Sequence, residues 1–203
     1  MTLTLIRGAN DEKQQEMLDL ADFADQYPNC EVIGTDISPI QPIWLPSNLN
    51  VEIDDFTQPW TFDSDSLNFV HGRYLLGSIG DWVALAKEAY KCLAPGGYFE
   101  SYEASPFIVS ADGTVPETSA MGQWGKIYED GGKKLGQSFT IVPDGVQKTA
   151  MEQAGFVDIE EWVFNGWSKV EIEAYAARFR RDLRNNEIHG TMMIRVIWGQ
   201  KTE

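Results

Sequence analysis

The sequence predicts an α/β fold in which helices cover both faces of a parallel sheet. Three observations favour this fold. Segments with strand and helix patterns alternate along residues 11–103, and the first two strands end on aspartates. Hydrophobic residues make up 43% of the 203 residues and aromatic residues 12%, which is enough for a packed core. Strands that alternate with helices are typical of parallel sheets, whose connections cross over the sheet faces.

The bulk composition indicates one folded domain over residues 1–203, because the chain is short for two cores. Its formal net charge of −15 argues against nucleic acid and anionic membranes as direct partners. No apolar run is long enough for a signal peptide or a membrane span, so we expect a cytoplasmic or nuclear protein that is not secreted. Cys30 and Cys92 fit neither a zinc spacing nor a disulfide framework, so no metal site is expected.

The first half of the chain contains the clearest pattern. A helix is predicted over residues 11–27, where Asn10 or Asp11 can cap its N-terminus. A second helix, over residues 82–93, can be capped by Asp81 and is followed by a turn at residues 95–97. Four strands are predicted around these helices, over residues 30–36, 51–55, 67–73 and 98–103.

The second half of the chain has a looser pattern. Residues 105–118 resemble a loop because they contain Pro and Gly. Ser168 followed by Glu171 forms a capping-box pattern at the start of the last predicted helix. The elements predicted here are helices over residues 123–135, 146–154 and 168–185, and strands over residues 156–164 and 192–199.

Two segments together resemble the class I S-adenosylmethionine-dependent methyltransferases: the acid-ended strand over residues 32–36, and a helix, an LxPGG motif and an aromatic strand over residues 81–100. More narrowly, the chain resembles fungal methyltransferases related to the secondary-metabolism regulator LaeA. In that family FADQYP leads into VIGTDISPIQP, and VHxRxL leads into DWxxLxxxAYxxLxPGGYxExxE. The corresponding residues here are 23–28, 32–42, 70–75 and 81–103, and the resemblance returns over residues 167–201.

The resemblance implies a Rossmann-like sheet with three parts. Residues 1–30 would form an N-terminal helical segment, residues 31–104 the cofactor side, and residues 105–203 the substrate side and C-terminal half. Relatives carry a first strand and a glycine loop like DxGTGTG directly before the segment that matches residues 23–28. This chain has no glycine between Gly8 and Gly34. The first strand is therefore expected to be missing, or replaced by residues 3–8.

A second departure from the family lies near residues 165–166. Relatives carry an intervening segment there that helps to form the substrate side of the pocket. In this chain the strand predicted over residues 156–164 leads almost directly into the helix predicted from Ser168.

The resemblance also implies three cofactor-binding residues. Asp36 matches the family acid that accepts hydrogen bonds from the ribose hydroxyls of S-adenosylmethionine, and the alternative is a strand-end acid that faces water. Asp54 and Asp55 match the position that meets the adenine amine, and the alternative is a pair of solvated turn residues.

Candidate catalytic and substrate-binding residues lie on the next two strands. His71 and Arg73 match the end of the fourth strand of relatives, which faces the cofactor, and a histidine there could act as a base. The alternative is a structural histidine bonded to the backbone. Glu100 and Glu103 could line the substrate side, or they could alternate toward solvent.

Three functional hypotheses follow. In the first, the chain is an accessory or degenerate member, a pseudoenzyme of fungal secondary-metabolite biosynthesis whose S-adenosylmethionine binding is impaired and whose partner is a small metabolite or a biosynthetic protein. In the second, it is an active methyltransferase acting on a small metabolite or a protein. In the third, it is a regulator acting through protein complexes. A product of aberrant splicing is the remaining alternative.

Overall fold

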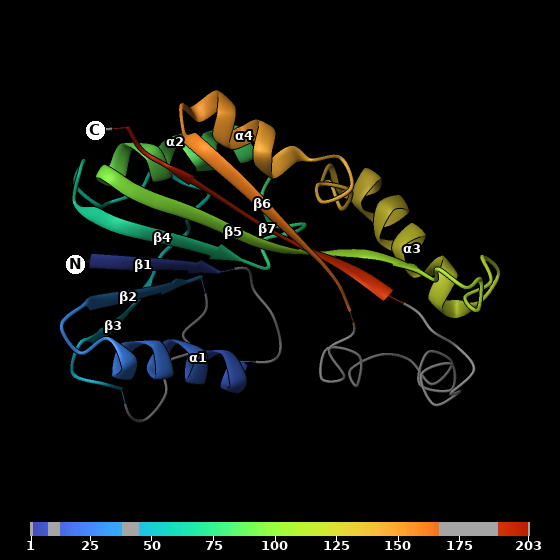
Figure 1. Ribbon diagram of the computed structural model, residues 1–203, viewed down its shortest axis with the longest axis horizontal. Coiled ribbons are helices and arrows are strands. Elements are labelled where there is room, and N and C mark those ends of the chain that lie inside the picture. Colours follow the sequence, from blue (N-terminus) through green and yellow to red (C-terminus); the bar gives the residue numbers. More distant parts are fainter. Residues whose placement is uncertain (1, 8–12, 38–44, 167–190, 203) are drawn as a thin grey trace.

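The computed structural model describes residues 2–7, 13–37, 45–166 and 191–202 of the chain. The described strands form one seven-stranded sheet in the order β3-β2-β1-β4-β5-β7-β6 (Figure 1). Strands β1 to β5 pair in parallel, whereas β7 pairs antiparallel with both β5 and β6. The strand bounds are β1 Thr2–Arg7, β2 Glu31–Asp36, β3 Leu49–Ile53, β4 Leu67–Arg73, β5 Leu93–Val109, β6 Val157–Gly166 and β7 Thr191–Gln200.

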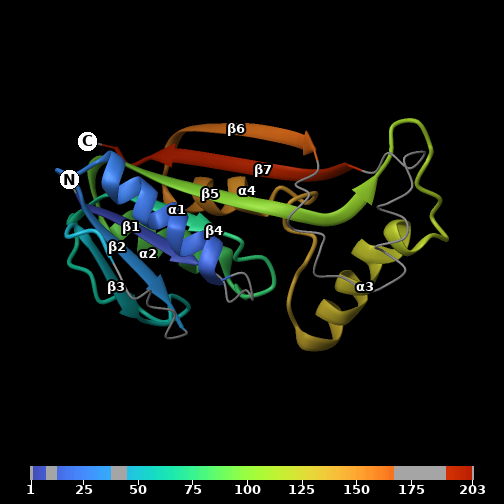
Figure 2. The same ribbon diagram turned by 90° about the horizontal axis from the view of Figure 1, so that it is seen from below.

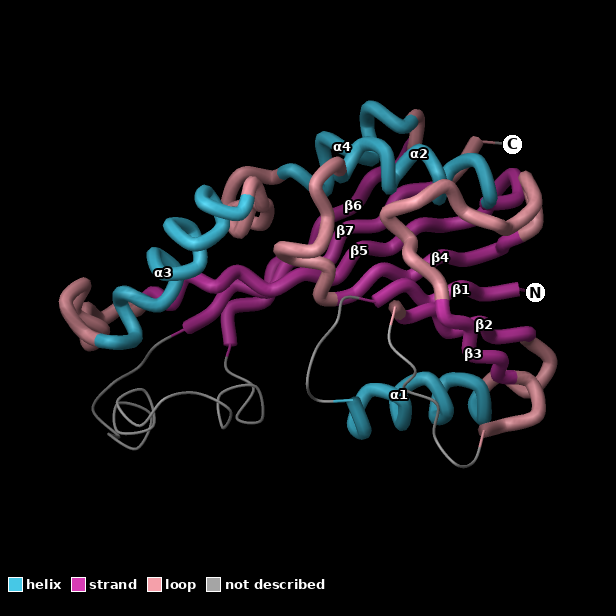
Figure 3. The backbone as a smooth tube through the Cα atoms, turned by 180° about the vertical axis from the view of Figure 1, so that it is seen from behind, coloured by secondary structure: helices cyan, strands magenta, loops and turns pink. Residues whose placement is uncertain are grey.

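Helices lie on both faces of this sheet, which confirms the predicted α/β fold (Figures 2 and 3). Helix α1 covers one face and packs on β2 and β3. Helices α2 and α4 lie side by side on the other face, and α3 lies beside the distal part of the long β5. The helix bounds are α1 Lys13–Gln26, α2 Trp82–Cys92, α3 Ala120–Leu135 and α4 Val146–Ala154. None of the described helices is long and apolar enough to cross a membrane.

Strand β1 occupies the centre of the sheet, between β2 and β4. Its residue Leu3 aligns with Val32 on one side and with Phe69 on the other. The sequence left open whether the first strand was missing or was replaced by the N-terminal residues. The structure shows the replacement, and the central position of the sheet is filled.

The larger core cluster lies between the sheet and helices α2 and α4. Asp81 caps α2, because its Oδ1 accepts a hydrogen bond of 2.9 Å from the backbone N–H of Ala84. Trp82, Leu85 and Ala89 follow at helical spacing and are buried. This face of α2 packs against α4 and against the buried side chains of β4 and β5.

A smaller core cluster lies under α1, where Ala24 packs with Val32 and Leu49. The side chain of Asn48 ties this region together, because its Nδ2 donates to the carbonyl oxygens of Ala24 and Cys30, each at 2.9 Å. Asn48 thereby holds the C-terminal end of α1 close to the start of β2. The C-terminal end of β2, at Asp36, lies at the opposite edge of the sheet.

Strand β5 is longer than the sequence predicted. It includes residues 95–97, where a turn was expected, and residues 105–109, which were expected to belong to a loop. Gly96 has a positive φ of 77°, and its N–H donates to the carbonyl oxygen of Lys201 at 2.9 Å. Both expectations were wrong because distant residues extend β5: β7 pairs with its far end, and Lys201, just after β7, bonds to Gly96 and Gly97. Short-range patterns do not report such pairing.

The remaining elements agree with the prediction within a few residues. Helix α3 begins three residues earlier than expected because the hydroxyl of Ser119 accepts a hydrogen bond from the N–H of Gly122 at 3.0 Å. The helix predicted over residues 168–185 and the segment that follows the β6 end at Gly166 lie outside the described residues.

Candidate functional site

Three predicted site residues lie at the edge of the sheet where parallel strands end. Asp36 is the last residue of β2, Asp54 follows the end of β3, and Arg73 is the last residue of β4. Because β2, β3 and β4 all run parallel to β1, their carboxyl ends lie at the same edge of the sheet (Figure 1). Ligands of such sheets bind at this edge, so these residues are candidates for a binding site.

The structure brings Asp36 and Asp54 together. Asp36 aligns with Ile53 across the β2–β3 pair, and the N–H of Asp54 donates to the carbonyl oxygen of Asp36 at 3.1 Å. Asp36 is only 5% exposed, whereas Asp54 is partly exposed. The edge therefore carries one buried and one accessible carboxylate on adjacent strands.

Asp55 is exposed and is engaged in the turn after β3. Its Oδ1 accepts hydrogen bonds from the hydroxyl of Thr57 at 2.6 Å and from the N–H of Thr57 at 3.0 Å. These two bonds, the hydroxyl first, hold the pKa of the Asp55 carboxyl below its ordinary value. The Asp-x-Thr spacing is a turn signal that the sequence contained, and Thr57 was not among the predicted site residues.

His71 and Glu100 form a contact between β4 and β5. They are aligned in the strand register, and Nδ1 of His71 lies 2.5 Å from Oε1 of Glu100. Their side chains are 17% and 29% exposed, and the ring of Phe69 stacks beside the imidazole with 6.3 Å between centroids. A predicted catalytic candidate and a predicted substrate candidate are thus one hydrogen-bonded pair on the face that also carries α1.

Arg73, at the end of β4, lies against two adjacent aromatic rings. Its guanidinium carbon is 4.8 Å from the ring centroid of Tyr74 and 5.1 Å from that of Tyr102. The two tyrosine rings meet edge to face at 5.5 Å. Such cation–π contacts orient the guanidinium group, so the end of β4 carries a positive charge held in a fixed place.

Glu103 is fully buried and binds backbone rather than solvent. Its Oε1 accepts from the N–H of Leu75 at 2.8 Å, and its Oε2 accepts from the N–H of Leu76 at 3.0 Å. Burial raises the pKa of this carboxyl to about 8, although the two N–H bonds act in the opposite direction. Side chains alternate along a strand, so Glu103 and Glu100 lie on opposite faces of β5, and the structure does not bring these two residues together.

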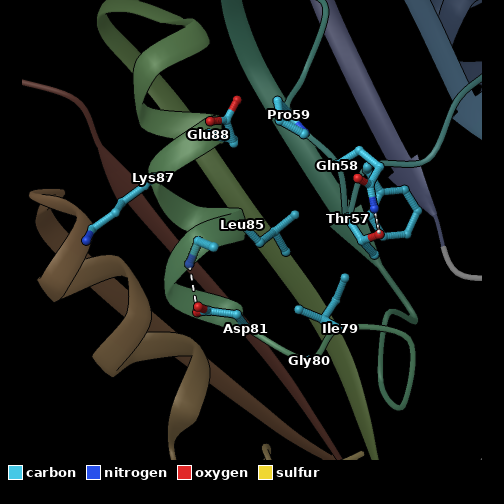
Figure 4. Close-up of a pocket in the computed structure, with 11 residues that line it drawn as sticks. Thr57, Gln58, Pro59, Ile79, Gly80, Asp81, Leu85, Lys87 and Glu88 are labelled. Atoms are coloured by element: carbon cyan, nitrogen blue, oxygen red, sulfur yellow. Dashed lines mark hydrogen bonds between the residues drawn. The ribbon is translucent and has the colours of Figure 1, made fainter.

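A pocket opens beside this edge, between the segment that follows Asp55 and the N-terminal half of α2 (Figure 4). Its volume is about 340 Å³. Phe56, Ile79 and Leu85 are its buried apolar residues. None of the site residues predicted from the sequence lines it, because its walls combine two loop segments, residues 56–59 and 79–81, with one face of α2. Within the described ranges, His, Cys, Asp and Glu side chains form no group of three that could hold a metal ion.

Comparison with known proteins gives a consistent result. The methyltransferase domain family matches residues 14–161. The methyltransferase pytC of Aspergillus terreus is 35% identical over 143 residues, which is 70% of this chain and 43% of that protein. The secondary metabolism regulator LAE1 of Cochliobolus heterostrophus is 33% identical over 72% of this chain and 49% of that protein. The chain therefore spans less than half the length of these two relatives.

Two further similarities extend over more of the chain. The probable methyltransferase tdiE of Emericella nidulans is 25% identical over 88% of this chain and 68% of that protein. The phosphoethanolamine N-methyltransferase 2 of Haemonchus contortus, solved with S-adenosyl-L-methionine, has a TM-score of 0.62 at 14% identity and covers all of this chain and 49% of that one. A methyltransferase from Archaeoglobus fulgidus has a TM-score of 0.60 at 15% identity, covering 98% of this chain and 86% of that one. At these identities the structures bear on the fold, and they confirm the class I sheet that the motifs predicted.

Proposed function

Because the chain belongs to the methyltransferase domain family, we propose that it binds S-adenosylmethionine and methylates a small metabolite in fungal secondary metabolism. The observation that carries the proposal is the buried carboxylate of Asp36 at the end of β2, beside the end of the central strand β1. Residues 31–104 would form the cofactor side and residues 105–203 the substrate side. The cytoplasm or the nucleus is the proposed location.

The residues at the edge of the sheet fit the nucleoside half of this cofactor. Asp36 would accept hydrogen bonds from the two ribose hydroxyls, since a carboxylate offers several acceptor positions. Asp54, beside it, would accept from the adenine amine, and Asp55 would keep the turn after β3 in place through Thr57. The cofactor supplies an activated methyl group. Residues 8–12, between β1 and α1, lie outside the described residues.

His71 is the proposed base of the reaction. With Nδ1–H donated to Glu100, the lone pair of the imidazole lies on Nε2, which can accept the proton that a hydroxyl or amine loses on methylation. Glu100 would hold the ring in this tautomer. Arg73, held against Tyr74 and Tyr102, would orient the acceptor by its charge.

A second candidate function is that of an accessory protein or regulator that transfers no methyl group. It is favoured by one feature of the sequence: the segment from β1 to α1 contains a single glycine, Gly8, where relatives have several. Side chains in that segment would hinder the close approach of backbone N–H groups to a ligand. Its partner would be a biosynthetic or regulatory protein.

Calorimetric titration with S-adenosylhomocysteine tests cofactor binding, which the methyltransferase function requires and the accessory function does not. We expect micromolar binding that Asp36→Asn weakens by at least about tenfold, while the exposed Asp130→Asn leaves it unchanged. A folded protein that releases no binding heat and gains no thermal stability in saturating ligand would contradict cofactor binding.

Transfer of a labelled methyl group then separates the two functions. The protein is incubated with labelled S-adenosylmethionine and a fungal metabolite extract. Label in a small molecule that is lost in His71→Ala supports the methyltransferase. A folded protein that neither binds the cofactor nor labels any molecule supports the accessory function.

A further inference from the structure

Strand β6 forms one end of the sheet and exposes large apolar side chains. Within the described part of the chain, β7 is its strand neighbour on one side and its other edge has none. Trp162 is 58% exposed, Val163 41% and Val157 39%. An edge strand presents a row of backbone N–H and C=O groups to which another extended segment can add. The edge of β6 therefore combines backbone donors and acceptors with apolar contact area.

The register of β6 on β7 determines which side chains share a face. Glu160 aligns with Trp198, so Glu160 and Trp162 lie on one face. Glu161 aligns with Ile197, which is packed in the core beside α4, so Glu161 and Val163 lie on the other face. Each face of the edge thus presents a glutamate and, two residues later, a large apolar side chain.

The apolar part of this edge is already oriented. The rings of Trp162 and Trp198 meet edge to face, with 6.0 Å between centroids and an interplanar angle of 61°. A ring held by a neighbour loses less conformational freedom when a partner binds. Aromatic side chains of this kind are enriched among the residues that dominate binding energy.

Charge decides which partner suits the edge. Asp158, Glu160 and Glu161 place three acids within four positions, against one arginine of β7, Arg195, whose Nε lies 3.4 Å from Oε1 of Glu161. The acids of this edge outnumber that arginine, and the whole chain carries a formal net charge of −15. A second copy would bring the same acids into one short ladder, and like charges across a strand pair are destabilising. A basic segment would complement them.

We propose that the β6 edge, Glu160 to Val163, binds an extended basic segment of a partner protein as an added antiparallel strand. Antiparallel addition continues the pattern of β7 and β6. The partner segment would carry two apolar residues, opposite Val163 and Trp162, followed by two basic residues, opposite Glu161 and Glu160. This interaction does not depend on cofactor binding or on methyl transfer.

Fluorescence anisotropy with a labelled peptide of sequence TTVIKKTT tests the proposal on the full chain. We expect binding that weakens at least about tenfold in the double variant Glu160→Lys/Glu161→Lys, and that weakens as salt is raised. The matched control Glu117→Lys/Asp130→Lys makes the same change in net charge on exposed residues elsewhere and should retain binding. The peptide TTVIEETT should bind the Glu160→Lys/Glu161→Lys variant better than it binds the original protein.

Two further measurements keep the test decisive. Trp162→Thr keeps a residue suited to a strand and should weaken peptide binding, with circular dichroism verifying the fold of each variant. Equal peptide binding by the two lysine variants, or no binding by the original protein, overturns the proposal. A dimer in light scattering that the Glu160→Lys/Glu161→Lys variant abolishes also overturns it, because the edge would then bind a second copy.

Discussion

Nδ1 of His71 lies 2.5 Å from Oε1 of Glu100, and this contact joins the side chains of two neighbouring parallel strands. The pair is partly shielded from solvent, with the ring of Phe69 stacked on the imidazole. A hydrogen bond in such a place is both a link between β4 and β5 and the feature that fixes which imidazole nitrogen carries the proton. Its energetic contribution can be measured independently of any enzymatic activity.

A double-mutant cycle with His71→Ala and Glu100→Ala should give a coupling energy of about 1 kcal/mol, because charge-assisted hydrogen bonds contribute about 1.5–3 kcal/mol and partial exposure reduces this. Urea unfolding at pH 6.5 is the measurement. The exposed pair Glu129 and Lys133 on α3 serves as the control and should couple more weakly. A coupling energy near zero between His71 and Glu100 would show that the pair forms no stabilising bond.

The buried carboxyl of Glu103 should make stability depend on pH. Its pKa rises from 4.5 to about 8 on folding, so between these values the folded protein holds a proton that the unfolded chain releases. The contribution of Glu103 to stability is therefore highest below pH 4.5, falls as pH rises toward 8 by on the order of 5 kcal/mol, and stays constant above that.

Glu103→Gln removes this titration. The amide nitrogen cannot accept the N–H of Leu75 or Leu76, so we expect a loss of about 1–3 kcal/mol at pH 5. The loss should shrink or reverse at pH 9. The difference in unfolding free energy between the original protein and the variant, measured in urea at both pH values, is the readout. The exposed Glu152→Gln should give a difference that does not vary with pH, and a constant difference for Glu103→Gln would contradict a raised pKa.

Gly77, in the turn that follows β4, should not tolerate alanine. Its φ is +79°, and a Cβ there would overlap the ring of Phe139. We expect Gly77→Ala to destabilise the protein by more than about 2 kcal/mol. Gly113 has a similar φ of +74° with open space around it. Gly113→Ala therefore measures the cost of the left-handed backbone conformation alone, and we expect it to lower the free energy of unfolding by about 1 kcal/mol. Equal losses in urea unfolding would mean that the Phe139 ring moves aside freely.

Much of the fold could be predicted because its signals are local. The strand that ends at Asp36 contains the β-branched pair Val32 and Ile33, and α2 begins directly after the cap residue Asp81. The extension of β5 could not be predicted in this way. The start of β5 depends on hydrogen bonds that Gly96 and Gly97 form with Lys201, about a hundred positions away. Taken alone, the sequence around Pro95 indicates a turn.

The candidate site was predictable in its parts but not in its arrangement. The acids at the ends of β2 and β3 follow from strand patterns and family motifs. The contact between His71 and Glu100 depends on the register of β4 on β5, which a bulge after Leu67 shifts. The burial of Glu103 depends on the turn at Leu75 folding back onto β5, and no pattern within either segment encodes that contact.

The central position of β1 has a consequence for cooperativity. Strands β2 and β3 lie on one side of it, and β4, β5, β7 and β6 lie on the other. Backbone pairing between these two groups passes through six residues, Thr2–Arg7. If β1 detaches, the strand pairing separates into a two-stranded and a four-stranded unit, and these units are then joined by side-chain packing, such as that of Phe69 on the cluster under α1. Detachment of β1 should therefore lower the cooperativity of unfolding.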